Sequence, residues 1–304
     1  MDMYQKRKIR KEKRENSNQN EKFHKVVLNW YPGHMAKTKR EIKERIDLVD
    51  VVVHVVDARI PKSSFIKDIN DFTKNKGKII LMSKYDLCDQ NETNKWVKYY
   101  ESLDYKVIVK KETVKKDLID AVKVIMKDVN DRRKKNGLLP KKAKVMIVGV
   151  SNVGKSTLIN KLVNKKATEV GNKPGVTKNI NMIKISNEID LIDTPGILWP
   201  KFEDEETALN LASMTIIKEE VLPIDEVAIY ILNKLSLLYP NILKNVFGIE
   251  TFNIENIEED YLKISKYKSI PLCNKEIDFD RINNYIINSI KNETIKGITF
   301  DRIK

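Results

Sequence analysis

Residues 149–157 read Gly-Val-Ser-Asn-Val-Gly-Lys-Ser-Thr, which matches GxxxxGK[ST] at every fixed position. The apolar run Val145–Val148 precedes them and the helix-like run TLINKLVNK overlaps their end. In such a strand–loop–helix setting, backbone N–H groups converge on phosphate oxygens at the helix N-terminus. We expect Lys155 to bridge the β- and γ-phosphates and Ser156 to bind Mg²⁺. The other residues expected around the phosphates are Asn152, Val153, Gly154 and Thr157. The motif predicts binding of a nucleoside triphosphate.

A second phosphate-linked motif, Asp193-Thr-Pro-Gly196, follows the apolar run Ile189–Ile192. A carboxylate at a strand end suits the Mg²⁺ shell, and Gly196 offers a backbone N–H to the γ-phosphate, so that its loop can respond to hydrolysis. Between the two motifs lies Pro-Gly-Val-Thr, whose Thr177 is placed to complete the metal shell. The predicted Mg²⁺ ligands are therefore Ser156, Thr177 and Asp193.

The base that is read is predicted from Ser83-Lys84-Tyr85-Asp86, which directly follows the apolar run Lys78–Met82. In a loop of this kind the Asp86 carboxylate accepts hydrogen bonds from guanine N1–H and the exocyclic amine, while the Lys84 stem packs along the base plane. Adenine offers neither donor there and would leave a desolvated carboxylate unpaired, a defect that can cost roughly 10⁴-fold in discrimination. The nucleotide is therefore predicted to be GTP.

Apolar runs alternate with helix-like stretches in the chain that carries these motifs. The expected strands are Val51–Val56, Lys78–Met82, Lys106–Val109, Val145–Val148, Ile180–Ile185 and Ile189–Ile192, the last two as a hairpin. The expected helices between them are Ser64–Lys74, Asn91–Leu103 and Lys116–Arg133. Such alternation is typical of an α/β fold with a mostly parallel sheet and helices on both faces. The base loop precedes the phosphate loop, an order that a site at the carboxyl edge of a sheet permits.

Composition sets the wider class of protein. The chain has 304 residues with 57 Lys and Arg against 43 Asp and Glu, a formal net charge of +14, and 41% hydrophobic residues. Hydrophobic content of this kind supports a folded core, no apolar run is long enough for a membrane span, and the two distant cysteines predict neither disulfides nor a zinc site. Positive charge is densest at Lys6–Arg14, Arg132–Lys135 and Lys141–Lys144, where a solvated surface and a polyanion footprint both fit.

Three segments are expected along the chain. We expect residues 1–28 to form a basic, disordered arm and residues 29–204 to form a GTPase domain. Residues 205–304 are expected to form a small all-α domain, because apolar residues recur there at helical spacing. The last segment is net acidic, although Lys263, Lys266 and Lys268 could form a local basic face.

Three longer motifs carry a family resemblance. WYPGHMAK, VDARIP (56–61) and LIDTPGILWPKFED (191–204), together with the permuted motif order, resemble ribosome biogenesis GTPase A of the YlqF type. The resemblance covers the chain from about Asn29 onward. It implies a circularly permuted P-loop GTPase domain followed by a small helical domain. It further implies a cytoplasmic, ribosome-associated and monomeric factor that acts in late assembly of the large ribosomal subunit, binds ribosomal RNA and proteins of that particle, and is released after GTP hydrolysis.

The chain departs from the family pattern at a few positions. Ser83 replaces the usual Asn of the base loop, which predicts weaker bracing of that loop, and Ser151 replaces a frequent proline. No residue is assigned to the loop that backs the guanine.

Many GTPases orient the attacking water with a glutamine directly after DxxG. In this chain that position is Ile197, which cannot do so. The resemblance instead implies that His34 of WYPGHM places the water with Lys155 stabilising charge, and that Asn152 helps to hold K⁺. The alternative is that residues 30–35 form a packing corner and that His34 is incidental, and His54 is expected to be structural. Two rival functions remain open: a GTPase for small-subunit or tRNA maturation, and a nucleotide-gated RNA-binding scaffold with little turnover.

Overall fold

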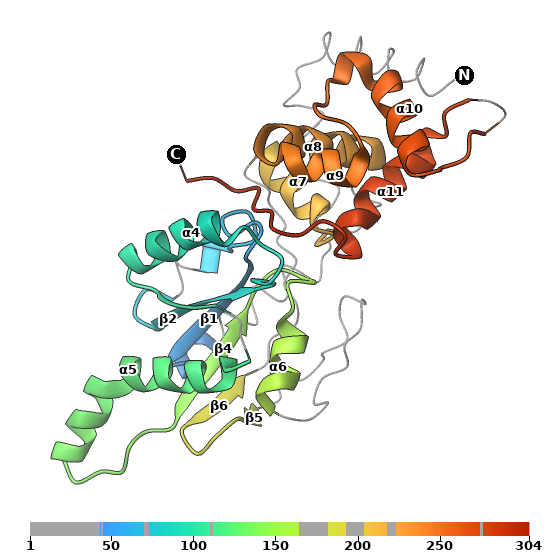
Figure 1. The fold of residues 1–304 in the computed structure, drawn as a ribbon. Coiled ribbons are helices and arrows are strands. Elements are labelled where there is room, and N and C mark those ends of the chain that lie inside the picture. The colour runs from blue at the N-terminus through green and yellow to red at the C-terminus, as the bar shows by residue number, and fades with distance from the viewer. Residues whose placement is uncertain are drawn as a thin grey trace. The chain divides into compact units, whose positions relative to one another are not determined.

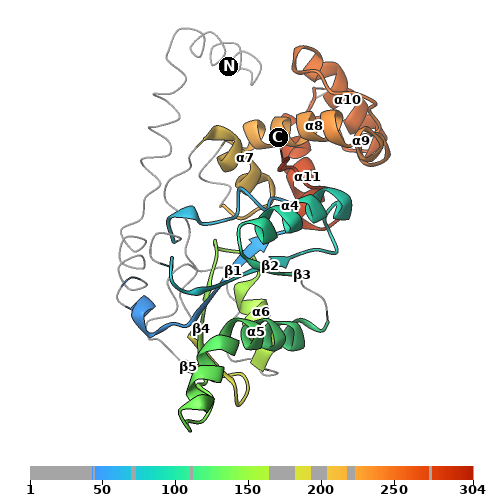
Figure 2. The ribbon, with the colours of Figure 1, turned by 90° about the vertical axis from the view of Figure 1, so that its left-hand side faces the viewer.

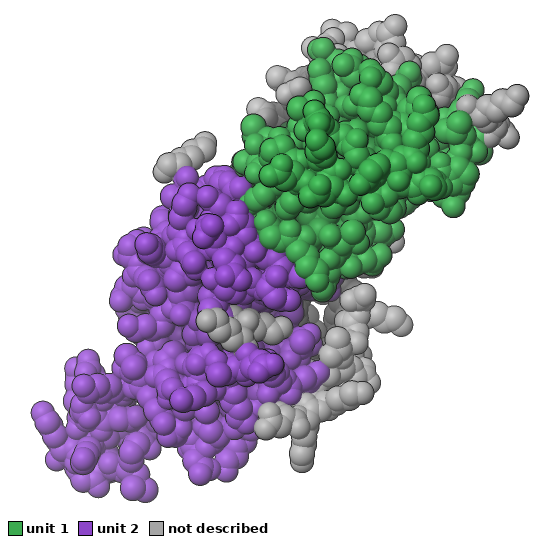
Figure 3. Space-filling view, viewed as in Figure 1, with its two compact units in different colours: residues 1–31, 200–300 green, residues 32–199, 301–304 purple. Residues whose placement is uncertain are grey.

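The computed structural model describes Lys43 and residues 45–69, 73–109, 112–163, 182–192, 204–217, 223–273 and 276–303. These residues form two compact units, shown in different colours in Figure 3. One unit contains a sheet and comprises the described residues from 43 to 192 together with 301–303. The other is helical and comprises the described residues from 204 to 300. The domain limits expected from the sequence stay a prediction.

Among the described residues six strands build the sheet, and each of them was expected from an apolar run. Their bounds are β1 Val51–Asp57, β2 Gly77–Ser83, β3 Lys106–Val109, β4 Ala143–Val148, β5 Met182–Lys184 and β6 Ile189–Ile192. The order across the sheet is β3-β2-β1-β4-β6-β5 (Figure 1), and only β5 runs antiparallel to its neighbour β6. Asp57 at the end of β1 lies opposite Ser83 at the end of β2, so the loops that follow both strands start side by side.

Helices cover both faces of this sheet, which explains why the strands are apolar on both sides. The helices are α4 Gln90–Ser102, α5 Val114–Lys135 and α6 Lys155–Val163. Figures 1 and 2 show α4 on one face and α5 with α6 on the other. Between them, every residue of β1 is buried. The expected mostly parallel α/β sheet is thereby confirmed.

One expected helix is absent from the described part of residues 64–74, where only the short 3₁₀ helix η2, Lys67–Ile69, is formed. Pro61 precedes this segment, and the Ser64 hydroxyl donates to Ile60 O over 2.7 Å. The Ser64 N–H donates to the same oxygen over 3.0 Å, as in one helical turn, but Phe65 N–H donates to the Lys62 carbonyl oxygen and the α-helical pattern does not continue. The helix prediction was therefore wrong for the residues described there.

The helical unit contains five α-helices among the described residues, namely α7 Glu205–Ser213, α8 Ile224–Leu238, α9 Pro240–Phe247, α10 Ile257–Tyr267 and α11 Phe279–Lys291. α8 packs against α7, α9 and α11. The α9 helix ends at Gly248 with φ +73°, where an added Cβ would lie 2.5 Å from the Tyr267 ring. Inside the unit, the buried Tyr261 hydroxyl donates to Asn283 Oδ1 over 2.6 Å. None of the helices that the structure describes combines the length and apolarity needed to cross a membrane.

Candidate nucleotide-binding site

The phosphate loop joins the buried strand β4 to α6 by a turn that its glycines make possible. An added Cβ on Gly149 would lie 2.6 Å from the Val55 carbonyl oxygen of the neighbouring strand, so a larger residue would push the strands apart. Gly154 has φ +100° and Asn152 has φ 55°, both in the left-handed region. Glycine adopts that region at little cost, and asparagine tolerates it better than most residues. These residues therefore keep the loop close to the sheet edge.

Lys155 is the first residue of α6 and is mostly buried, at 8% exposure. Its Nζ donates to the carbonyl oxygen of Val150 over 2.7 Å, across its own loop. Ser156 is half-buried and Thr157 exposed in the same first turn. Three predicted phosphate-site side chains thus lie at a helix N-terminus, where unpaired backbone N–H groups and the helix dipole favour anions.

Ser83 joins the base loop to the phosphate loop. Its hydroxyl oxygen lies 2.6 Å from the Val153 carbonyl oxygen and 3.0 Å from that of Val56. One hydroxyl proton serves one of these acceptors at a time, and Val153 is the nearer. The sequence predicted weaker bracing where serine replaces asparagine. The hydroxyl nevertheless reaches the phosphate loop directly.

Lys84 and Asp86 complete the described part of the base loop. Lys84 has a left-handed backbone, with φ 53°, and its Nζ lies 3.2 Å from Asp57 Oδ2. Asp86 is exposed two residues further on. Leu87 N–H donates to the Lys84 carbonyl oxygen over 3.0 Å, which closes the turn that presents Asp86.

The partner of Lys84 was not predicted as a site residue. Asp57 is fully buried, and Arg59 donates to both of its carboxylate oxygens, over 3.0 Å from Nε and 2.8 Å from a terminal nitrogen. Burial acts to raise the pKa of the Asp57 carboxyl, but Arg59 and Lys84 outweigh it and hold that pKa well below its usual range. A usable signal existed, because parallel strands end at one edge and both Asp57 and Ser83 are polar residues that end apolar runs.

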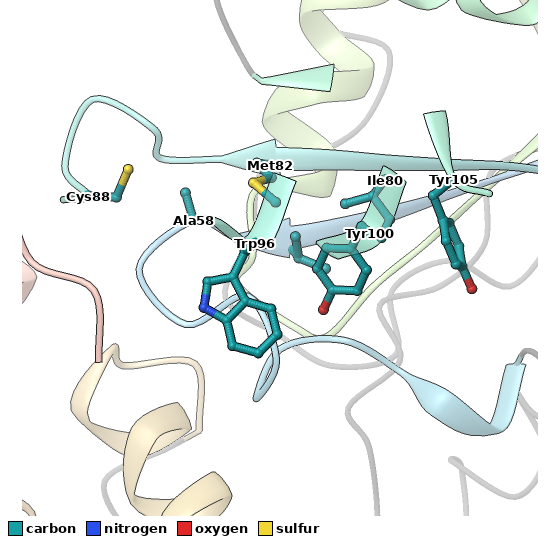
Figure 4. Close-up of a cluster of buried hydrophobic side chains, with 8 residues drawn as sticks. Ala58, Ile80, Met82, Cys88, Trp96, Tyr100 and Tyr105 are labelled. Atoms are coloured by element: carbon teal, nitrogen blue, oxygen red, sulfur yellow. The ribbon is translucent and has the colours of Figure 1, made fainter. Parts of the chain in front are cut away.

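An apolar cluster supports these two loops on the α4 side of the sheet (Figure 4). Its buried members are Val56, Ala58, Ile80, Met82, Cys88, Trp96, Tyr100 and Tyr105. The Tyr100 hydroxyl also donates to the Pro61 carbonyl oxygen over 3.0 Å. Burial, the largest cause, raises the Cys88 thiol pKa to about 11, so this sulfur packs as a neutral group.

Four predicted site residues, His34, Thr177, Asp193 and Gly196, lie outside the described residues, as does Ile197. Within the residues that are described, no group of three or more His, Cys, Asp and Glu side chains could hold a metal ion. Of the three expected Mg²⁺ ligands, the structure describes Ser156, whose hydroxyl is a hard oxygen donor on the first turn of α6. That donor fits Mg²⁺, and the exposed Asn152 amide is an oxygen donor of the kind that K⁺ takes.

The strand order, with a phosphate loop after β4 and a base loop after β2, defines a circularly permuted P-loop GTPase. Two family models match the chain: RsgA GTPase over residues 32–203, and 50S ribosome-binding GTPase over residues 144–275.

Relatives match over most of their length. Ribosome biogenesis GTPase A of Bacillus licheniformis is 38% identical, over 91% of this chain and 99% of that protein. The protein of the same name from Priestia megaterium is 37% identical, over 91% and 97%. A crystal structure of GNP-bound YlqF from T. maritima matches with a TM-score of 0.59 at 25% identity, covering 88% of this chain and 98% of that one. The chain belongs to the ribosome biogenesis GTPase A family and is a GTPase.

Proposed function

We propose that the protein is an assembly factor for the large ribosomal subunit that binds the immature particle with GTP and leaves it after hydrolysis. The observation that supports this most directly is the contact of the Ser83 hydroxyl with the Val153 carbonyl oxygen, because a GTP site built from the loops after β2 and β4 requires those loops to be neighbours. The relatives named above and the match to a 50S ribosome-binding GTPase model favour the ribosome as partner. We expect the factor to be monomeric and to work in the cytoplasm on the ribosome.

The nucleotide steps follow from the residues of both loops. Asp86 reads the guanine edge, and the backbone around Val153 and Gly154 holds the phosphates at the N-terminus of α6. Lys155, which donates to Val150 in this structure, turns to the β- and γ-phosphates. Ser156, Thr177 and Asp193 would hold Mg²⁺, which neutralises charge on the phosphates when bound.

Hydrolysis needs a group that holds the attacking water, and Ile197 cannot do so. We assign this task to His34, which would approach when the particle is bound. Asn152 would hold a K⁺ ion, whose positive charge near the phosphates replaces that of an arginine finger. Loss of the γ-phosphate releases the backbone of Gly196 and the Thr177 segment, and the particle-binding conformation is lost.

A candidate RNA-binding surface lies at the end of α5. The last buried residue of that helix is Met126, yet the helix continues to Lys135, about 13 Å further at 1.5 Å per residue. Figure 1 shows this end of α5 extending past the sheet. It carries four cations in its last turn, the α5 cations Arg132, Arg133, Lys134 and Lys135.

Within the part of the chain that the structure describes, the α5 cations form no ion pair, although Asp128 and Asp131 lie in the turn before them and Arg133 Nε donates to the Leu139 carbonyl oxygen over 2.9 Å. Asp50 pairs with Lys141 and Asp190 with Lys142. The loop that follows α5 leads into β4 at Ala143, so the α5 cations lie at the amino edge of the parallel strands, opposite the nucleotide loops. Clustered cations attract phosphate backbones by displacing counterions. RNA bound there would leave the nucleotide site open.

The helical unit offers a weaker alternative surface. Its candidate cations, called the α10 lysines, are Lys263 and Lys266 of α10 and Lys268 directly after that helix. Lys263 already pairs with Glu259 and Asp260, and Lys268 Nζ lies 4.9 Å from the Tyr267 ring centroid. Partly compensated charge in a net acidic unit attracts a polyanion less. We therefore favour the α5 cations as the main RNA contact.

GTP turnover in K⁺ buffer, alone and with each purified ribosomal subunit, tests the proposal, with Na⁺ buffer as the ion control. Strong stimulation by the large subunit alone, lost in Na⁺, is the expected result. Stimulation by the small subunit or by tRNA alone would replace the proposed partner. Slow turnover that neither subunit changes would favour a nucleotide-gated scaffold.

His34→Ala then tests the water-positioning role. We expect particle-stimulated turnover to fall while GTP affinity stays. Lys155→Ala is the matched comparison, because it should weaken nucleotide binding itself. Unchanged stimulated turnover in His34→Ala would remove His34 from the mechanism.

A further inference from the structure

Asp57, the last residue of β1, places a buried carboxylate between two cations. Arg59 donates to Asp57 three times, from its backbone N–H and Nε to Oδ1, each over 3.0 Å, and from a terminal nitrogen to Oδ2 over 2.8 Å. Lys84 Nζ lies 3.2 Å from the same Oδ2. The Asp57 side chain is fully buried and that of Arg59 is 3% exposed, whereas that of Lys84 is 28% exposed. Asp57 of the VDARIP motif thus contacts the lysine of the base loop, and Arg59 of the same motif holds Asp57.

Stability alone does not account for the second cation. A bidentate arginine already neutralises the Asp57 carboxylate, so the buried pair is complete with Arg59. Lys84 is partly exposed and could keep its ammonium group in water at no desolvation cost. The contact with Asp57 therefore does more to fix the position of the Lys84 side chain than to stabilise the buried Asp57–Arg59 pair.

Asp57 and the turn that follows it are fixed at several points. Asp57 N–H donates to the Ser64 hydroxyl over 3.0 Å, and Ala58 N–H donates to the Ser83 carbonyl oxygen over 2.9 Å. The Thr93 hydroxyl donates to the Ala58 carbonyl oxygen over 2.9 Å. The carboxylate is consequently held at a fixed place beside the base loop, with its orientation set by Arg59.

We propose that Asp57 and Arg59 are positioning residues for guanine recognition, which act by anchoring the Lys84 ammonium group so that its stem is ready to pack along the base. The proposal rests on the assignment of Ser83–Asp86 as the base loop. An anchored lysine loses less rotamer freedom when nucleotide binds, and this freedom corresponds to a roughly tenfold effect on affinity. Because the stem contacts the base plane and not its edge, the anchor should strengthen guanine and hypoxanthine nucleotides alike.

To test this proposal, the affinities for GDP and IDP are measured in the wild type and in Asp57→Asn. The base of IDP lacks the exocyclic amine of guanine. We expect both affinities to fall roughly tenfold, with their ratio unchanged. Asp86→Asn should instead change the ratio, because it alters the group that accepts the exocyclic amine. Asp50→Asn is the control, since Asp50 pairs with Lys141 in the same unit and lies apart from this network.

A double-mutant cycle then asks whether Asp57 acts through Lys84. Lys84→Met should remove the tether, so that adding Asp57→Asn costs nothing further. An equal loss in both backgrounds would overturn the proposal, as would an unchanged GDP affinity in Asp57→Asn. If Asp57→Asn does not fold, Arg59→Lys replaces it in the same test, because it keeps the charge but loses the two-point contact with Asp57. The expected loss of GDP affinity is then smaller.

The guanine assignment and the positioning role of Asp57 can be refuted separately. Wild-type protein that binds ADP as well as GDP would refute the guanine assignment itself. Wild-type selectivity for GDP that Asp86→Asn alters, together with no effect of Asp57→Asn, would refute only the positioning role.

Discussion

The buried His54 gives a sharp test of how this sheet is stabilised. The residue lies in the middle of β1 with 1% exposure, stacked on Phe65 at a centroid distance of 4.9 Å. Neither ring nitrogen has a hydrogen-bond partner among the described residues. Burial first, and Lys78 second, lower the His54 pKa from 6.5 to about 3. We predict that His54→Leu, a substitution of similar volume, stabilises the unit that contains the sheet.

The expected gain depends on pH in a defined direction. At pH 7, leaving a buried polar group unpaired costs about 1–3 kcal/mol, while the lost ring stacking is worth about 0.5–1.5 kcal/mol, so we expect a net gain of about 1 kcal/mol. The folded state keeps His54 neutral, whereas the unfolded chain takes up a proton below pH 6.5. Wild-type stability therefore falls as pH drops, by about 1.36 kcal/mol per pH unit, or about 2.7 kcal/mol between pH 6.5 and 4.5.

Urea unfolding at pH 7.0 and 4.5, with hydrogen exchange of β1 peptides to localise the effect, measures this difference. Other titrating groups are common to both proteins and cancel in the comparison. The stability advantage of His54→Leu should grow on acidification by about 2.7 kcal/mol. A constant advantage, or a His54 ring that titrates near pH 6 in the folded protein, would refute the reasoning.

Three further outcomes are expected. Ser83→Ala should weaken GDP binding roughly tenfold, because one hydrogen bond of about 1–1.5 kcal/mol is lost. Ser83→Asn should bind GDP about as tightly as the wild type, and calorimetry measures the three affinities. Replacing three of the α5 cations (Arg132, Lys134 and Lys135) by alanine should lower the slope of log affinity for ribosomal RNA against log salt by roughly two to three units, and the same change at the α10 lysines should have a smaller effect in filter binding. EDTA should abolish GTP turnover, and added Mg²⁺ should restore it in a phosphate-release assay.

The strands could be predicted because burial on both faces leaves a plain trace in the sequence. The Val51–Val56 run admits few interpretations other than a buried strand, and the structure extends it only to Asp57. The motif around Gly149 likewise predicts a loop close to the sheet, since glycine permits the close approach to Val55 that a Cβ would prevent.

Other features depend on contacts that no local pattern encodes. Residues 64–74 carry a helical pattern, yet Ser63 donates from its backbone N–H and its hydroxyl to the buried Asp301, 238 positions away. The Trp96 ring N–H also donates to the Asp301 carbonyl oxygen, over 3.4 Å. Such long-range pairs override local preference, and periodicity cannot reveal them. The partnership of Asp57 with Lys84 is similar, because it becomes visible only when β1 and β2 are known to be neighbours.

The permuted order of motifs changes which part of the chain directly follows the segment expected to sense the γ-phosphate. Strand order still brings the ends of β2 and β4 to one edge, and Ser83 bonded to Val153 joins their loops across the sheet. The chain after β6 carries Asp193 and Gly196, and its next described element is α7 of the helical unit. In an unpermuted chain that segment would return to the sheet. Here the segment expected to sense the γ-phosphate is also the covalent path to the helices, so we expect the nucleotide to act first on the helical unit.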